Sequence, residues 1–207
     1  MSTKRRVESS NLRALLGKRT NRESMVMNSQ KGFTLAELIT TFGIAALLLS
    51  IAAPGLGGLA KNTNQVTSAN ALLSDFHFAR DLAITSNSRV TVCPSAGGLN
   101  CEPVGWETGR IIFVDLDSDR TVSGGEIVRR VSDDVGEISI DTAEFSTSIS
   151  YRPNGRAMAE LVRDNTGEFT LCDDRGSAYA RVVVVEMSGR PRVSREDSQG
   201  LMPSCPG

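Results

Sequence analysis

The sequence predicts an α+β protein in which one long N-terminal helix packs against antiparallel β-sheets. The first observation is an apolar run, 38–53, that contains no charged residue. The second is an amphipathic stripe that follows this run, and the third is a series of short strand-like segments separated by turn residues. At 207 residues, the chain is long enough for a helix of this kind and one domain with its own core.

The apolar run, extended back to Phe33, has the ~20 residues that cross a bilayer as a helix. It contains one charged residue, Glu37. A carboxylate near the start of a membrane helix is costly to bury, so a partner is expected, most simply the free amine of a neighbouring copy. That amine would exist only if the chain were cut just before Phe33.

The string Gly-Phe-Thr-Leu-Ala-Glu-Leu at 32–38 resembles the prepilin peptidase site of type IV pilins and type II secretion pseudopilins. The resemblance implies that prepilin peptidase cuts between Gly32 and Phe33, and that Phe33 becomes an N-methylated terminus. It also implies that Glu37 pairs with the terminal amine of the adjacent subunit during assembly. An ordinary single-pass anchor with a stray glutamate is the alternative.

Charge is distributed unevenly along the chain. Residues 1–32 carry eight Lys or Arg and two Glu, so the total of −1 becomes −7 once they are removed. A basic segment before an apolar run holds the N-terminus in the cytoplasm and sends the C-terminal part outward. We therefore expect a single-pass inner-membrane protein with a periplasmic C-terminal domain. The resemblance adds later incorporation into an extracellular pilus, near its tip.

The helix is expected to continue beyond the membrane. Pro54 stands where the pilin family bends its first helix, and the glycines at 55–58 predict a loosened stretch that ends by about Lys61. Apolar residues then recur at three-and-four spacing, while Asp75 falls elsewhere. The stripe consists of Val66, Ala69, Leu72, Leu73, Phe76, Ala79, Ala83 and Ile84.

The chain is thus expected to have a basic cytoplasmic leader and three further parts. The leader is 1–32, the membrane and assembly half of the helix is 33–54, its amphipathic half is 55–86, and an exported β-rich domain with a C-terminal tail is 87–207.

Short segments with strand character follow the helix, and turn signals separate several of them. They are 89–93, 109–115, 126–131, 137–140, 148–152, 168–172 and 178–187. The β-branched run at 181–185 predicts a central strand covered on both faces. The first strand and the segment that begins at Trp106, itself expected in the core, are similar to the GspH/FimT branch of minor pilins and pseudopilins. That similarity implies the type IV pilin fold.

The four cysteines are expected to form disulfides, because the compartment beyond the membrane is oxidising. Four cysteines allow three connectivities. We favour Cys93–Cys101, which closes a short glycine-rich loop, and Cys172–Cys205, which ties down the tail. Zinc is disfavoured, since the sequence has no Cys-x-x-Cys pair and one histidine.

An acidic segment, 115–126, follows one of the expected strands. Its oxygen-bearing side chains stand at the loop positions with which an EF-hand wraps Ca²⁺. Arg120 replaces the glycine at the sixth position of such a loop, and no helix flanks the segment. A solvated acidic turn is therefore the preferred interpretation and no metal is assigned. The weak calcium candidates are Asp115, Asp117, Asp119 and Glu126.

An arginine-rich segment, 188–195, lies near the C-terminus. Two guanidinium groups separated by one residue on an extended segment project the same way and can fork onto successive phosphates. The segment also resembles the Gly-Arg-x-Arg motif with which FimT-like minor pilins of naturally transformable bacteria bind DNA. The expected DNA-binding residues are Gly189, Arg190, Arg192, Arg195 and Arg181, with Arg175 as a further candidate. Alternatively, Gly-Arg simply ends the last strand.

These observations predict a FimT-like minor type IV pilin that binds double-stranded DNA for uptake in natural transformation and contributes to pilus assembly. Its other expected partners are major and minor pilins, prepilin peptidase and the inner membrane. Two alternatives stay open: a structural subunit without DNA binding, either a GspH-like pseudopilin of type II secretion or a pilus-priming minor pilin, and a calcium-binding adhesive subunit. The sequence has no Gly-x-Ser-x-Gly, P-loop or paired zinc-ligand histidines, so neither an enzyme nor a cofactor is expected.

Overall fold

The computed structural model describes residues 32–133, 135–159 and 165–205. The expected leader therefore lies, except for Gly32, outside the described residues. The chain divides into two units, one that ends at Leu47 and one that begins at Leu48. The second unit contains the second part of the helix and all the described strands.

The helix, α1, spans Leu35–Ser86 without interruption. Thr34 caps its start, since its hydroxyl accepts a hydrogen bond from the N–H of Glu37 at 3.2 Å. The expected loosening over 55–58 is wrong. A proline in a helix interior costs about 3 kcal/mol and a glycine about 1 kcal/mol, and neither ends this helix, which continues for several turns on each side.

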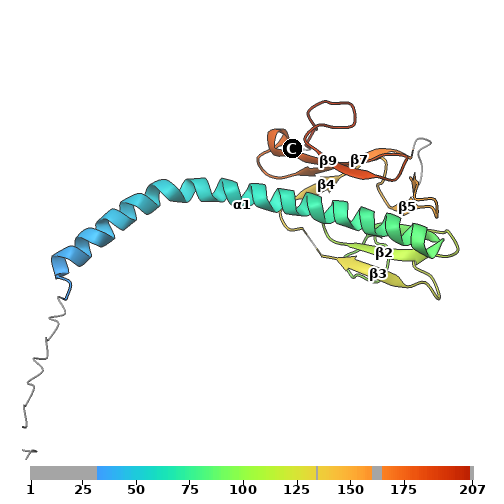
Figure 1. The fold of residues 1–207 in the computed structure, drawn as a ribbon, viewed down its shortest axis with the longest axis horizontal. Helices are drawn as coiled ribbons and strands as arrows, with labels where there is room; N and C mark the ends of the chain where they lie inside the picture. Colours follow the sequence, from blue (N-terminus) through green and yellow to red (C-terminus); the bar gives the residue numbers. More distant parts are fainter. Residues whose placement is uncertain (1–31, 134, 160–164, 206–207) are drawn as a thin grey trace, which may run out of the picture. The chain divides into compact units, whose positions relative to one another are not determined.

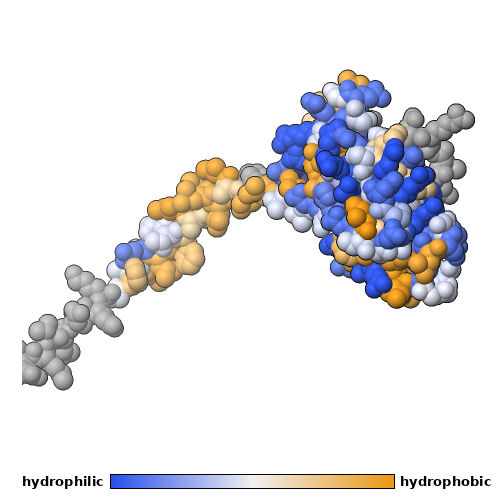
Figure 2. Space-filling model, turned by 45° about the vertical axis from the view of Figure 1, so that its right-hand side comes forward, coloured by the Kyte–Doolittle hydropathy of each residue, from blue (hydrophilic) through white to orange (hydrophobic). Residues whose placement is uncertain are grey.

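The first part of α1 has the length and composition of a membrane span. The apolar window is Leu35–Ala52, and its side chains are exposed in the chain alone. Figure 2 shows these apolar side chains along this part of the helix. The expected transmembrane helix is confirmed.

Two antiparallel sheets follow the helix (Figure 1). The first sheet contains β1 (Arg89–Pro94), β2 (Arg110–Asp115), β3 (Val128–Ser132), β5 (Ile149–Tyr151) and β6 (Ala157–Met158). The second contains β4 (Ser139–Asp141), β7 (Gly167–Cys172), β8 (Arg181–Val185) and β9 (Pro191–Ser194). Their orders are β3-β2-β1-β5-β6 and β4-β7-β8-β9.

The strands agree with the expected segments except for β6, which was not expected, and for the region near the C-terminus. The segment 178–187 begins later than expected, because Ser177–Tyr179 forms a short 3₁₀ turn, η1, before β8. The arginine-rich segment contributes a strand of its own, β9, at the edge of the second sheet. β8 lies between β7 and β9, and Val182–Val185 are buried, as the β-branched run predicts.

The core lies where α1 meets both sheets. Phe76 on the helix contacts Trp106 and Phe169, with ring centroids 6.2 and 4.8 Å away. Trp106 is buried and donates its indole N–H to the carbonyl of Phe145 at 2.9 Å. Because a buried indole needs an acceptor, this bond fixes the tryptophan as the core anchor that was expected.

A buried ion pair joins α1 to the first sheet. Asp75 accepts from the guanidinium of Arg110 at 2.7 Å, and both side chains are almost fully buried. Ser132 donates to the same carboxylate at 2.8 Å. The placement of Asp75 away from the buried stripe is therefore wrong. Conversely, Val66 and Ile84, assigned to the stripe, are exposed.

Both favoured cysteine pairs form disulfides. The Cα atoms are 5.5 Å apart in Cys93–Cys101 and 5.8 Å apart in Cys172–Cys205. The second bond holds the C-terminal tail against the second sheet, where Ser198 N–H also donates to Glu168 at 2.7 Å. Since Glu168 and Cys172 both belong to β7, the tail is fixed to that strand at two places.

We predict that Asp75→Ala lowers the free energy of unfolding by about 3–5 kcal/mol, because it leaves Arg110 buried without its partner. Urea unfolding of the detergent-solubilised chain, followed by the fluorescence of the one tryptophan, measures the change. Asp174→Asn is the control, since it breaks an exposed pair with Lys61 that should be worth ~0–1 kcal/mol. Equal losses in the two variants would show that the buried pair does not hold the helix.

Candidate functional site

The Gly-Arg-Pro-Arg segment forms the end of the β8–β9 turn and the start of β9. Pro191 pairs with Val185 and Arg192 with Val184, so Arg192 lies in the edge strand. Arg190 and Arg192 are exposed, whereas Pro191 between them is buried. Because side chains alternate along an extended chain, the two guanidinium groups share one side of the hairpin.

Gly189, in the β8–β9 turn, packs closely against the backbone of Gly155. Its φ is +75°, and a Cβ at this position would lie 1.9 Å from the carbonyl oxygen of Gly155. Only glycine permits this approach. The same Gly155 oxygen accepts a hydrogen bond from Arg80 on α1 at 3.1 Å. The β8–β9 turn therefore rests on the β5–β6 turn, which in turn is bonded to the helix.

The contact between Gly189 and Gly155 brings the β8–β9 turn close to arginines that were not predicted from the sequence. Arg152 and Arg156 flank the β5–β6 turn and are exposed, and Arg80 reaches the same turn from the helix. They stand far from 189–192 in sequence, and only the contact between Gly155 and Gly189 makes them neighbours. A turn signal beside arginines was visible in the sequence, but it does not say which other turn it meets.

Arg192 has an acidic neighbour in the turn. Its Nε lies 3.6 Å from a carboxylate oxygen of Glu186, and the two side chains are 48% and 55% exposed. An exposed pair of this kind is worth ~0–1 kcal/mol. A phosphate can therefore compete for Arg192 at little cost.

The structure does not bring the other predicted arginines to this turn. Arg181 begins β8 and Arg195 follows β9, so both lie at the opposite end of the hairpin. Burial, with a contribution from Arg195, lowers the pKa of Arg181. Alternation also places these two on the opposite face from Arg190 and Arg192.

Arg175 has a structural role. It donates to Asp173 at 2.5 Å and to Gln65 on α1 at 3.2 Å, and its guanidinium lies 4.3 Å from the ring centroid of Tyr179. The hydrogen bonds from Arg175 hold the pKa of Asp173 below its ordinary value. We therefore leave Arg175 out of the candidate interface.

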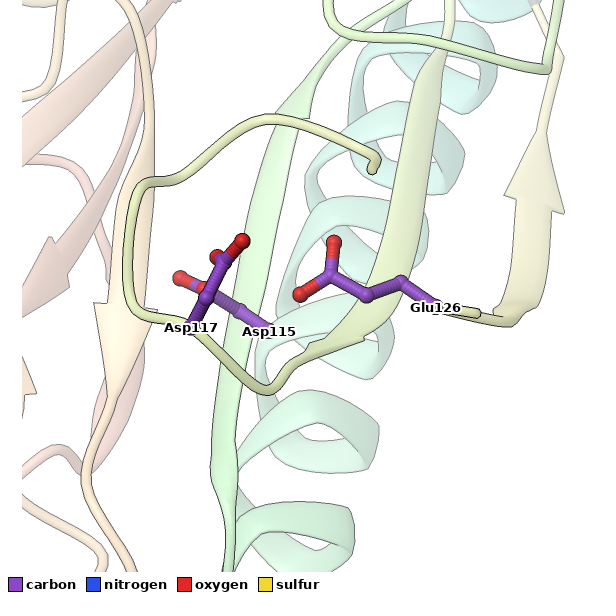
Figure 3. A group of neighbouring side chains, drawn as sticks. All are labelled: Asp115, Asp117 and Glu126. Carbon is purple, nitrogen blue, oxygen red and sulfur yellow. The ribbon is translucent and has the colours of Figure 1, made fainter. Parts of the chain in front are cut away.

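The structure brings together three of the four calcium candidates. One carboxylate oxygen from each of Asp115, Asp117 and Glu126 lies within 4.8 Å of the other two (Figure 3). Asp119 is not part of this group. Its carboxylate accepts the backbone N–H and hydroxyl of Thr121 at 2.7 and 2.8 Å, which holds its pKa below the ordinary value.

Comparison with known proteins decides the family. Residues 68–189 match the family described as "Type II transport protein GspH", and residues 27–53 match the "Prokaryotic N-terminal methylation motif". The chain belongs to the GspH family. It is thus a minor pilin or pseudopilin of the GspH/FimT type, as its N-terminal and strand motifs predicted.

A solved structure has a similar fold. The fold of this minor pilin is similar to that of the Pseudomonas aeruginosa (strain PAO1) type IV minor pilin FimU, with a TM-score of 0.52, 17% identity and coverage of 71% of this chain and 98% of that one. A second crystal form of FimU has a TM-score of 0.49 and 17% identity, with coverage of 65% of this chain and 97% of that one. No curated protein matches the sequence. The likeness to FimU confirms the type IV pilin fold.

We predict that Gly189→Ala destabilises the β-rich domain by about 1–3 kcal/mol more than Gly200→Ala does, because only the first variant forces a Cβ into a packed neighbour. Both glycines have φ near +75°, at +75° and +79°, but a Cβ at Gly200 meets nothing closer than 4.0 Å. The difference therefore isolates the clash with Gly155. Thermal unfolding of both variants measures it, and similar losses would mean that the two turns are not in contact.

Proposed function

We propose that this minor pilin binds double-stranded DNA through its β8–β9 turn and contributes in this way to DNA uptake in natural transformation, besides pilus assembly. The observation that carries the proposal is the exposure of Arg190 and Arg192 on one side of a turn that Gly189 holds against Gly155. Such a support limits the motion of the turn. Less conformational entropy is then lost when DNA is bound.

The proposed contacts are with phosphates. A guanidinium presents several donors in a planar fork that matches phosphate oxygens. Arg190 and Arg192 supply two such forks, and Arg152 and Arg156 on the adjoining turn extend the basic surface. Because phosphates carry no sequence information, we expect no preference among DNA sequences.

Net charge makes this binding weak for a single subunit. The chain after residue 32 carries −7, so long-range attraction to DNA is poor and affinity must come from the local patch. Binding should therefore be sensitive to salt. Several copies in one filament, or neighbouring pilins, would raise the effective affinity by avidity.

The proposal includes the maturation and location of the chain. Cleavage between Gly32 and Phe33 would leave a free amine at the end of α1, and the exposed Glu37 in the first turn of that helix is available to pair with it. The match to the N-terminal methylation motif supports this step. The divisions 1–32, 33–54, 55–86 and 87–207 follow from it, with the last in the periplasm and then near the pilus tip.

A second candidate function is that of a structural subunit without DNA binding, as in a type II secretion pseudopilin. The family description favours it, and so does the packing of Gly189. That packing explains a Gly-Arg pair at the end of a hairpin without any ligand. Both functions predict assembly through α1, so they differ only in what the β8–β9 turn binds.

We predict that the chain from Phe33 onward, without the basic segment 1–32, binds labelled double-stranded DNA in detergent at low salt, and that Arg190→Gln with Arg192→Gln weakens binding by about tenfold or more, because two charge-assisted contacts are lost. Fluorescence anisotropy measures the affinity. The variant must match the wild type in thermal stability.

The control is the double variant Lys61→Gln, Arg129→Gln, which also removes two positive charges but does so away from the β8–β9 turn. Arg129 lies in β3, at the other edge of the first sheet from β5 and β6. This control should bind within about twofold of the wild type at equal net charge. If the wild type does not bind at low salt, or if both double variants lose affinity equally, the turn is not a DNA site and the structural function is the better account.

A further inference from the structure

We propose that the β2–β3 loop binds a calcium ion between the carboxylates of Asp115, Asp117 and Glu126. Asp115 ends β2, Asp117 lies two residues into the loop, and Glu126 stands shortly before β3. Figure 3 shows the carboxylates of Asp115 and Asp117 beside one another and that of Glu126 turned toward them. This inference does not rest on DNA binding.

The separations of the oxygens suit such an ion. Oxygens within 4.8 Å of one another can share a cation that lies between them, since Ca²⁺–oxygen distances are about 2.3–2.6 Å. Without a cation, three carboxylates at this separation repel each other. A divalent cation between the three carboxylates would offset this repulsion, because its positive charge attracts each of them.

Asp115 provides a second, independent observation. It is 1% exposed, and its Oδ2 accepts from the hydroxyl of Thr91 at 2.8 Å. Its Oδ1 is buried and has no hydrogen-bond partner among the described residues. A buried carboxylate oxygen without a partner is costly, because it has lost water and gained nothing in return. A bound cation would satisfy it.

The loop is already shaped for this role. Glu126 accepts the N–H groups of Leu116 at 2.6 Å and Ser123 at 3.0 Å, so its side chain is drawn back across the loop. Ser123 also donates to Asp117 at 3.1 Å. These bonds hold the two side chains toward Asp115, and each carboxylate oxygen keeps lone-pair capacity for a metal.

The neighbouring cluster fixes the base of the loop. Val122 in the loop packs on the small buried group of Cys93, Ile111 and Phe113. The carbonyl oxygen of Arg120 lies 3.4 Å from the sulfur of Cys101, so the loop also packs against the Cys93–Cys101 disulfide. Because the loop is anchored between the ligands, little chain entropy remains to be lost when the ion binds.

Calcium is the ion that the ligands favour. All three are hard carboxylate oxygens, and the group has no nitrogen or sulfur donor to select a transition metal. Calcium accepts irregular coordination completed by water or carbonyl oxygens, whereas magnesium demands near-octahedral geometry at shorter distances. Three carboxylates, one buried at the end of β2 and two on the loop, resemble the weaker sites of extracellular proteins, with Kd of about 10⁻⁴–10⁻³ M.

The test is calorimetric titration of the full-length, EDTA-treated chain in detergent with calcium chloride. We expect saturable binding of one ion in that concentration range, and at least about tenfold weaker binding of magnesium. Asp117→Asn should raise the Kd for calcium about tenfold or more, because an exposed ligand loses its charge without disturbing the core. Glu126→Gln should do the same.

The matched control is Asp119→Asn. It removes one carboxylate from the same loop, but outside the group of three, and should change the Kd less than about twofold. Circular dichroism of each variant verifies that the fold is retained. Absence of saturable binding by the wild type at millimolar calcium overturns the inference. So does a signal that Asp117→Asn leaves unchanged, since the ion would then lie elsewhere on this acidic chain.

Discussion

Asp75 and Arg110 meet at 2.7 Å in the interior, and the position of the helix on the first sheet depends on this contact. Two charges removed from water cost several kcal/mol each, so the pair is tolerated only where its hydrogen bonds are complete. Ser132, the carbonyl of Trp106 and Arg130, whose Nε lies 3.2 Å from the other carboxylate oxygen of Asp75, complete them. A shift of the helix along its axis would leave both charges buried and unpaired, which fixes the register of α1.

That register carries through to the candidate interface. With Asp75 in place, Phe76 meets the aromatic rings of the core, and Arg80, about one turn further along the helix, reaches the carbonyl of Gly155. Gly155 is also the residue on which Gly189 packs. The exposed arginines of the β8–β9 turn are thus connected to the helix, because the β8–β9 turn packs on the β5–β6 turn and Arg80 of the helix bonds to the β5–β6 turn. The helix that anchors this minor pilin therefore also positions its proposed DNA contact.

Local patterns predicted the elements well and their contacts poorly. Residues close in sequence predict the helix of the apolar run and the β-branched strand at 181–185, and the oxidising compartment predicts that the cysteines pair. The structure contains the helix, the strand and both disulfides. Asp75 was misplaced because a polar residue in a helical pattern suggests exposure, and its partner is 35 residues away. For the same reason Arg152 and Arg156 were missed, and Asp119 was grouped with ligands that it does not join. Spacing alone could not show that Thr121 engages it.

The dependence of DNA affinity on salt tests the central claim most directly, because each phosphate contact adds about 0.9 to the slope of log K against log salt. The account predicts a slope of about −2 to −4 for the wild type, and a slope shallower by about 2 when Arg190 and Arg192 are both glutamine. A double variant that binds more weakly with an unchanged slope would contradict it, since the two arginines would then act on the shape of the turn and not on phosphate.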